Sequence, residues 1–282
     1  MRLFLLVSLT MAAFAANSLL TRVAVESGAA DPGAFAVIRV ATGAIALVLL
    51  VRAKGQTVPL RAKDRMWGAA TLSLYMVGFS LAYRTLDAGL GALVLFGVVQ
   101  ISMFAYAASR GPIGSRRAIG AGTAFAGLSW VLWPTGGAAP DPTGAVLMAL
   151  AGLGWGGYSL LGRKEPAALA ATAANFCIAL PITGIVLMFA GQEMALPTLS
   201  GWLLAATSGA ITSGLGYALW YSLLPRLSPT VAATVQLSVP IIALVAGAML
   251  LGEIIGPRLI VGAILVVGGI ALAVTGQNRS RL

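Results

Sequence analysis

One arginine, Arg39, lies inside a long apolar run, where little water is available to solvate its charge. It falls about six residues, or about 9 Å of helical rise, from the outer end of that run. An ionisable side chain at such depth indicates a function by default. Its guanidinium could face a cavity and attract the carboxylate of a substrate. The alternatives are that Arg39 extends to the membrane surface or forms an ion pair with Asp31, Asp87 or Glu253.

Aromatic side chains form a second candidate feature. Tyr75, Phe79 and Tyr83 recur every four residues, which places them on one face of a helix. The other predicted substrate-binding residues are polar or aromatic side chains within apolar runs: Asn17, Ser80, Gln100, Trp155, Tyr158, Tyr217 and Gln236. Aromatic walls with a few polar groups suit amphipathic cargo. The alternative for each is an ordinary helix–helix contact or, for Tyr83, an aromatic belt at the membrane surface.

Several residue types that other functions require are missing from the apolar runs. No Asp or Glu lies deep in any of them, the chain has no histidine, and its one cysteine, Cys177, cannot form an intrachain disulfide. A membrane-embedded enzyme would need such groups clustered at membrane level, so no catalytic, metal or cofactor site is expected. An exporter that exchanges a lipophilic cation for protons needs a buried carboxylate, so multidrug or quaternary-ammonium efflux is disfavoured. Zwitterionic, neutral and anionic cargo stay open, as does coupling to protons.

The composition places these residues in a membrane protein. Of the 282 residues, 59% are hydrophobic and 9% are charged, whereas a soluble domain carries roughly a quarter charged residues. The net charge of +10 does not indicate nucleic-acid binding, because the basic residues lie in short segments between apolar runs. We therefore expect a lipid bilayer and a small-molecule substrate as partners. The oligomeric state is open and includes a monomer.

Ten apolar segments are long enough to form helices that cross a bilayer. They cover residues 3–24, 33–51, 66–83, 88–109, 118–134, 143–161, 168–190, 202–224, 230–251 and 259–275. The first segment imitates a secretory signal peptide behind Arg2, but we expect it to be retained because it has a counterpart later in the chain. Gly152-Leu-Gly-Trp-Gly156 predicts close helix contact, and Pro181 and Pro240 predict kinks.

An internal repeat divides the chain into two halves. Residues 14–22, FAANSLLTR, align with residues 155–163, WGGYSLLGR, at an offset of 141. The halves, residues 1–137 and 138–282, would each hold five helices, and because five is odd they must cross the membrane in opposite directions. Such inverted repeats are common in secondary transporters, which place the substrate site between the halves.

The basic residues follow the same alternation between the two sides of a membrane. With the N-terminus inside, 14 of the 18 Lys and Arg residues fall in cytoplasmic segments. Because basic residues accumulate on the cytoplasmic side, both termini are expected to be cytoplasmic.

The stretch from 214 to 272 carries a set of motifs in a fixed order: Gly216-Tyr217, Leu219-Trp220-Tyr221, the mid-helix Pro240 and Leu251-Gly252-Glu253. This pattern resembles the EamA module of the drug/metabolite transporter superfamily, and residues 32–39 resemble the family's second helix, which often carries an arginine. The resemblance implies an all-α integral membrane protein with ten transmembrane helices as two inverted five-helix repeats. It also implies export by alternating access across the bacterial inner membrane. Within the superfamily, the chain is similar to bacterial exporters of amino acids, including aromatic ones.

The first half departs from this pattern at two places. Gln100 stands where the second half has Pro240, and the segment 110–117 stands where the Gly-Glu ending would be. We therefore expect the two gates to work differently. Glu253 itself is expected to be an interfacial residue that holds a loop or pairs with Arg258.

Overall fold

The computed structural model describes residues 2–61, 65–112, 114–133, 140–162, 165–192, 194–227 and 229–275, and no strand occurs within these ranges. The expected boundary between the halves, at residues 137 and 138, lies outside them. Outside them too are several basic residues that were expected to be cytoplasmic: Lys63, Arg163, Lys164, Arg279 and Arg281.

Helices account for nearly all of the described chain. Their bounds are α1 Arg2–Glu26, α2 Pro32–Ala53, α3 Arg65–Ala82, α4 Ala88–Ala108, α5 Ser115–Leu132, α6 Pro142–Gly162, α7 Ala168–Phe189, α8 Leu199–Ala206, η1 Thr207–Leu215, α9 Gly216–Leu223, η2 Leu224–Arg226, α10 Pro229–Gln236, α11 Ser238–Leu251 and α12 Pro257–Thr275. The apolar segments expected at 202–224 and 230–251 are each built from consecutive shorter elements. The other expected segments each coincide with one helix to within a few residues.

The shorter elements have local causes. Between α8 and α9 the chain adopts a π-helix, η1, which continues the helix with more residues per turn. The break between α10 and α11 falls at Leu237, just before Pro240, whose missing N–H cannot bond to the preceding turn. The helix thus breaks three residues before Pro240, whereas α7 continues without interruption through Pro181.

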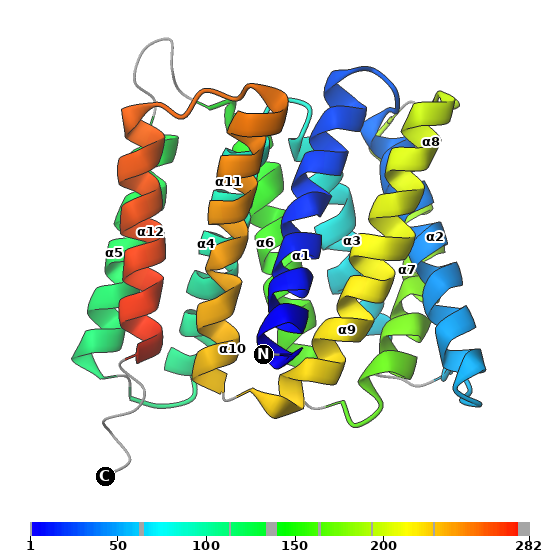
Figure 1. Ribbon diagram of the computed structural model, residues 1–282, viewed down its shortest axis with the longest axis horizontal. Coiled ribbons are helices and arrows are strands. Elements are labelled where there is room, and N and C mark those ends of the chain that lie inside the picture. Colours follow the sequence, from blue (N-terminus) through cyan, green and yellow to red (C-terminus); the bar gives the residue numbers. More distant parts are fainter. Residues whose placement is uncertain are drawn as a thin grey trace.

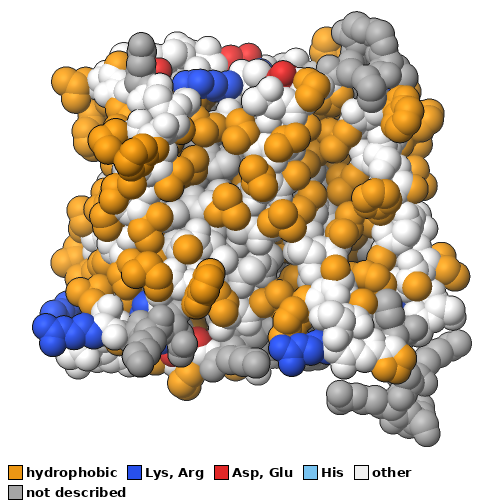
Figure 2. All heavy atoms as spheres, turned by 180° about the vertical axis from the view of Figure 1, so that it is seen from behind, with side chains coloured by type: hydrophobic (Ala, Val, Ile, Leu, Met, Phe, Trp, Pro, Cys, Tyr) orange, Lys and Arg blue, Asp and Glu red, His pale blue; other side chains and the backbone are white. Residues whose placement is uncertain are grey.

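Within the described residues, seven helical segments are long and apolar enough to cross a membrane, as judged by length and composition. They lie at Arg2–Glu26, Pro32–Ala53, Ala88–Ala108, Pro142–Gly162, Ala168–Phe189, Thr234–Leu251 and Pro257–Val274. Figure 2 shows hydrophobic side chains over the middle of one face, with charged side chains only toward its upper and lower edges. This distribution fits a protein whose middle faces lipid.

Successive helical segments alternate in direction, so α1 begins and α12 ends at the same end of the bundle (Figure 1). We name this the basic end, because most of the described Lys and Arg residues lie there, whereas Arg22, Arg84 and Arg258 lie at the opposite end. The residues of the basic end are Arg2, Arg52, Lys54, Arg61, Arg65, Arg110, Arg116, Arg117 and Arg226. We name the opposite end the acidic end after its carboxylates: Glu26, Asp31, Asp87, Asp141 and Glu253.

The helices pack mainly across the two parts of the chain rather than within them. The most extensive contacts join α5 to α12, α3 to α6 and α7, α2 to η1 and α7, α4 to α6 and α11, and α1 to α11 and η1. Figure 1 shows α5 with α12 at one edge of the bundle and α1 near its middle. The centre is therefore formed by helices from both parts of the chain.

Small residues allow α6 to approach its neighbours closely. A Cβ atom on Gly154 would lie 2.6 Å from the Tyr75 amide nitrogen in α3, and one on Gly152 would lie 2.9 Å from the Leu95 carbonyl oxygen in α4. Gly156 faces α4 through Ser102. The close helix contact predicted from the glycine spacing is confirmed, because side chains at these positions would separate the helices.

Candidate functional site

A cluster of hydroxyl groups projects from η1 toward α1. The Oδ1 atom of Asn17 accepts hydrogen bonds from the hydroxyls of Ser208 at 2.8 Å, Thr212 at 2.6 Å and Ser213 at 3.3 Å. All these side chains are buried. A π-helix carries more residues per turn than an α-helix, which helps to bring residues four and five positions apart onto the same face. The π-helix therefore presents several hydroxyls to one amide.

Arg39 lies beside this cluster and is fully buried, with 0% exposure. Its Nε donates to the Ser213 hydroxyl at 3.0 Å, and its Nη2 donates to the Tyr75 hydroxyl at 2.9 Å. The guanidinium carbon lies 4.8 Å from the ring centre of Phe79 and 5.3 Å from that of Tyr75, within the range of cation–π attraction. Its Nη1 has no hydrogen-bond partner among the described residues.

The carboxylates considered as partners of Arg39 are engaged elsewhere. Asp87 forms an ion pair with Arg22 at 3.4 Å, and Asp31 accepts a hydrogen bond from the Ala195 amide. In the described part of the chain Arg39 takes part in no ion pair. Both alternatives for Arg39, an ion pair with an acidic residue and extension to the membrane surface, are wrong, because its charge stays inside and meets hydroxyls and aromatic rings instead.

Aromatic rings surround the bundle axis next to Arg39. Tyr75 lies 5.3 Å from Phe79 and 5.1 Å from Trp155, measured between ring centres, and Trp155 lies 4.9 Å from Tyr217. These rings and their neighbours enclose a space that we call the central chamber, lined by Phe14, Asn17, Ser18, Tyr75, Phe79, Leu95, Phe96, Trp155 and Tyr217. Its volume of about 10 Å³ leaves room for little more than one water. The chamber is therefore closed.

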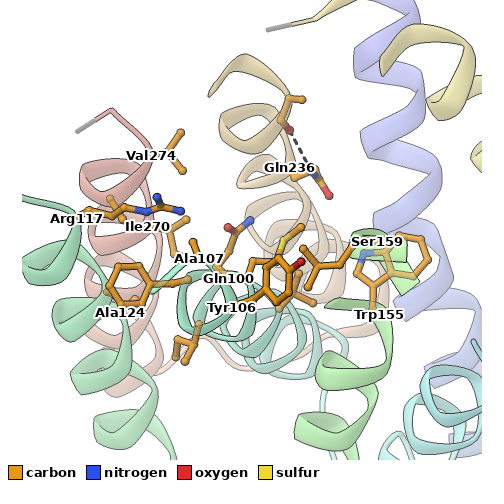
Figure 3. A pocket seen from close by; sticks show the side chains of 18 of the residues that line it. Gln100, Tyr106, Ala107, Arg117, Ala124, Trp155, Ser159, Gln236, Ile270 and Val274 are labelled. Carbon is orange, nitrogen blue, oxygen red and sulfur yellow. Dashed lines mark hydrogen bonds between the residues drawn. The ribbon is translucent and has the colours of Figure 1, made fainter. Parts of the chain in front are cut away.

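A larger cavity opens between the chamber and the basic end. This inner vestibule has a volume of about 380 Å³ and is lined by residues of α4, α5, α6, α9, α10 and α12. Figure 3 shows Gln100, Arg117 and Gln236 around it, with Trp155 and Ser159 on α6. Trp155 lines both spaces, so its indole separates the vestibule from the chamber.

A second cavity adjoins the vestibule, with which it shares Tyr106, Leu160 and Tyr221. This side cavity of about 490 Å³ lies among α3, α6, α7 and α9 and is lined in part by Tyr158. Arg65 and Glu165 also line it and form an ion pair at 2.6 Å, which balances their charges.

At the acidic end, the turn after α11 contacts the start of α4. The carboxylate of Glu253 accepts hydrogen bonds from the backbone amides of Ala88 and Gly89, the latter at 3.1 Å. These amides open α4, where the helix dipole favours a negative group. Gly247 makes room for the carboxylate, which any Cβ there would meet. Burial raises the pKa of the Glu253 carboxyl above its ordinary value.

The predicted site residues fall into several groups in the structure. Asn17, Tyr75, Phe79, Trp155 and Tyr217 line the central chamber, and Arg39 lies behind Tyr75 and Phe79. Gln100 and Gln236 instead line the vestibule, and Tyr158 lines the side cavity. Ser80 and Tyr83 are buried without lining any of these spaces, and Tyr83 packs on Phe79 with ring centres 4.9 Å apart.

Sequence reasoning missed the hydroxyls of η1. Thr207-Ser208 and Thr212-Ser213 form a polar pair repeated after five residues within an apolar run. That spacing is a signal that could have been found, because an α-helix would spread the two pairs over different parts of its surface. The missed chamber residues Phe14, Ser18, Leu95 and Phe96 carry no such signal.

Comparisons with known proteins agree with the helical architecture. Residues 142–275 match the EamA-like transporter family. A protein of Pseudomonas aeruginosa described as uncharacterized is 44% identical over 273 residues, which is 96% of this chain and 94% of that protein. A solved structure described as "Crystal structure of protein" superposes with a TM-score of 0.68 at 19% identity, covering 100% of this chain and 98% of its own. That structural likeness concerns the fold alone.

Proposed function

Because the chain belongs to the EamA-like transporter family, we propose that it is a secondary transporter that exports small amphipathic metabolites, above all amino acids including aromatic ones, by alternating access. The observation that carries this proposal is the buried polar and aromatic centre, which lies beneath a vestibule open at one end and behind a contact that closes the other.

The proposed architecture is ten transmembrane helices arranged as two inverted five-helix repeats. The proposed repeat pairs α1 with α6, α2 with α7, and α3 with the consecutive elements α8, η1 and α9. It pairs α4 with α10 and α11, and α5 with α12. Under this pairing the contacts α5–α12, α4–α11 and α2–α7 map onto themselves, while α3–α6 maps onto the contacts of α1 with η1 and α9. The pairing of contacts supports a pseudo-twofold axis through the centre.

Residues related by the repeat meet at this proposed axis. Phe14 and Trp155, which open the two copies of the repeated motif, lie edge to face with ring centres 6.1 Å apart. Transporters built from inverted repeats bind substrate where the repeats meet. The position of these rings on the chamber wall supports a substrate site there.

The orientation follows from the distribution of charge. Basic residues accumulate on the cytoplasmic side of membrane proteins, so the basic end is proposed to face the cytoplasm of a bacterial inner membrane. The vestibule would then admit cargo from the cytoplasm, and the Glu253 contact would seal the external side. This arrangement corresponds to the inward-facing state from which an exporter loads.

Transport of amino acids tests the proposed function directly. Purified protein in liposomes that contain unlabelled amino acid should accumulate labelled amino acid by exchange, and aromatic amino acids should compete well. Protein-free liposomes are the control. A flat uptake trace across a broad amino-acid panel would contradict this substrate class.

Cysteine labelling tests the proposed orientation. In a background with Cys177→Ala, Gln56→Cys at the exposed turn after α2 should be protected from a membrane-impermeant maleimide in intact cells. Ser27→Cys, exposed after α1 at the acidic end, should react and serves as the matched control. Rapid external labelling at Gln56→Cys with protection at Ser27→Cys would reverse the assigned orientation.

A further inference from the structure

Positive charge marks the route from the basic end to the central chamber. The charged residues lining the vestibule are Arg110 and Arg117, and no Asp or Glu in the described part of the chain lines either the vestibule or the chamber. In the adjoining side cavity, the charge of Glu165 is balanced by Arg65. At the far side of the chamber, Glu253 is bound to the first amides of α4.

Arg39 is connected to the chamber by a hydrogen bond to Tyr75. Tyr75 lines the chamber, and its hydroxyl oxygen accepts the hydrogen bond from Arg39 Nη2 at 2.9 Å. A hydroxyl that accepts from a cation keeps its own hydrogen for donation, and the positive neighbour makes it a stronger donor. Tyr217 also lines the chamber, and its hydroxyl has no hydrogen-bond partner among the described residues. Two tyrosines that line the chamber thus carry hydroxyls able to donate, and one of these hydroxyls is bound to a cation.

A carboxylate is the group that such a wall would bind best. It accepts hydrogen bonds only, and its negative charge would balance the buried guanidinium, whose burial without a counter-ion is costly. The faces of the aromatic rings attract cations, but Arg39 already lies over the rings of Tyr75 and Phe79 and disfavours an ammonium group beside them. The amide oxygen of Asn17 already accepts from the hydroxyls of Ser208, Thr212 and Ser213, and Arg39 would repel a second cation.

We propose that the site takes organic monocarboxylates with an aromatic or branched apolar body and without a free ammonium group, in preference to zwitterionic amino acids. The inference rests on the proposed transport function and concerns the chemical class of its cargo. The aromatic rings of Phe14, Phe79 and Trp155 would hold the apolar body once the chamber opens, while the hydroxyls of Tyr75 and Tyr217 bind the carboxylate. Arg39 acts through Tyr75 as a positioning and charge-balancing residue.

A matched set of phenyl compounds separates the carboxylate from the ammonium. Labelled phenylalanine, 3-phenyllactate, N-acetylphenylalanine and phenethylamine are exchanged into liposomes holding the full-length protein, with protein-free liposomes as the control for diffusion. We expect 3-phenyllactate and N-acetylphenylalanine to show half-saturation concentrations about tenfold lower than phenylalanine, because the ammonium group of phenylalanine would lose its water beside the buried charge of Arg39. Phenethylamine should not exchange.

The outcomes distinguish the two proposals. If phenylalanine exchanges better than 3-phenyllactate, this inference is overturned and amino-acid export stands. If phenethylamine exchanges as well as the acids, recognition of the carboxylate is overturned while transport stands. If none of the compounds exchanges, both the transport function proposed above and this inference fail.

Variants test the assigned roles through the half-saturation concentrations of the substrates, which the loss of a merely structural contact would leave unchanged. Arg39→Gln should raise the half-saturation concentration for 3-phenyllactate about tenfold and remove its advantage over phenylalanine, because it removes the charge that repels the ammonium group, whereas Arg39→Lys should keep part of that advantage. Tyr75→Phe should raise the half-saturation concentration about tenfold for both compounds, because both carry the carboxylate that the hydroxyl binds. Tyr75→Phe keeps the ring and carries the test if Arg39→Gln does not fold. Arg226→Gln removes an exposed charge at the basic end and is the control. An unchanged half-saturation concentration for 3-phenyllactate in Tyr75→Phe, or an unchanged ratio of the two compounds in Arg39→Gln, would overturn the assignment.

Discussion

Replacement of Gly209 by Ala is expected to lower the stability of the protein by about 3 kcal/mol and to abolish transport. Gly209 in η1 packs directly on α2, where a Cβ atom would overlap the Arg39 carbonyl oxygen and the Thr42 side chain. Because one of these atoms belongs to the backbone, it cannot rotate away. The π-helix would have to move, and the hydroxyls that it presents to Asn17 would move with it.

The measurement is a thermal melt of the purified protein in detergent together with exchange transport in liposomes. We expect the midpoint of Gly209→Ala to fall by about 5–10 °C and its exchange rate to fall at least about tenfold. Gly184→Ala in α7 is the matched control, since no heavy atom lies within 4 Å of a Cβ there and Ala favours the helix. Equal melting temperatures for the two variants would show that the close approach of α2 and η1 has no energetic importance.

Replacement of Glu253 by Ala is expected to open the acidic end. The change leaves the amides of Ala88 and Gly89 without their acceptor, and an unsatisfied buried amide costs about 1–3 kcal/mol. The balance between closed and open forms should shift about tenfold or more. Glu253→Gln keeps one of the two acceptor oxygens, so it should open the acidic end less than Glu253→Ala does.

Labelling of a buried reporter measures this opening. Ser80 is fully buried in α3, and in a Cys177→Ala background Ser80→Cys should react with an external water-soluble maleimide about tenfold faster when Glu253 is Ala than when it is Glu. Glu26→Ala, which removes another carboxylate at the acidic end, is the matched control. The contact would not be a closing contact if Glu26→Ala and Glu253→Ala had the same effect.

The raised pKa of Glu253 makes the stability of this contact depend on pH. Burial raises the pKa of the carboxyl in the closed form; Asp87 raises it too, while the Ala88 and Gly89 amides and Arg22 lower it. An open acidic end would expose the carboxyl and return its pKa toward the ordinary value, so the closed form binds the proton more tightly. Lowering the pH through the raised pKa therefore favours closure, and raising the pH weakens it.

We expect labelling of Ser80→Cys, after correction for maleimide reactivity, to increase with pH above the ordinary pKa of a glutamate, through the raised pKa. Glu253→Gln cannot titrate and should remove this dependence. The same slope in Glu253→Gln would assign the effect to another group.

The sequence by itself determined the helical segments, their alternation and the unusual place of Arg39 inside an apolar run. Hydropathy and helical period are local properties, so most apolar runs coincide with single helices to within a few residues, and the runs at 202–224 and 230–251 coincide with consecutive shorter elements. The spacing of Tyr75 and Phe79 likewise follows from the helical period, and both residues line the chamber. A charged residue deep in an apolar run must either be buried within the protein or extend to the membrane surface, which is why Arg39 was a candidate functional residue.

Only the tertiary structure decided which groups meet. Asn17 and Ser213 lie 196 residues apart, Arg39 and Ser213 lie 174 apart, and Glu253 reaches Ala88 across 165 residues. No local rule predicts such pairs, because they depend on how separate helices pack. The same packing places Gln100 and Gln236 in the vestibule rather than in the chamber, since their depth along the bundle depends on where each helix lies against its neighbours. The local sequence thus determines the helices and places a charge within an apolar run, and long-range packing determines which groups contact that charge.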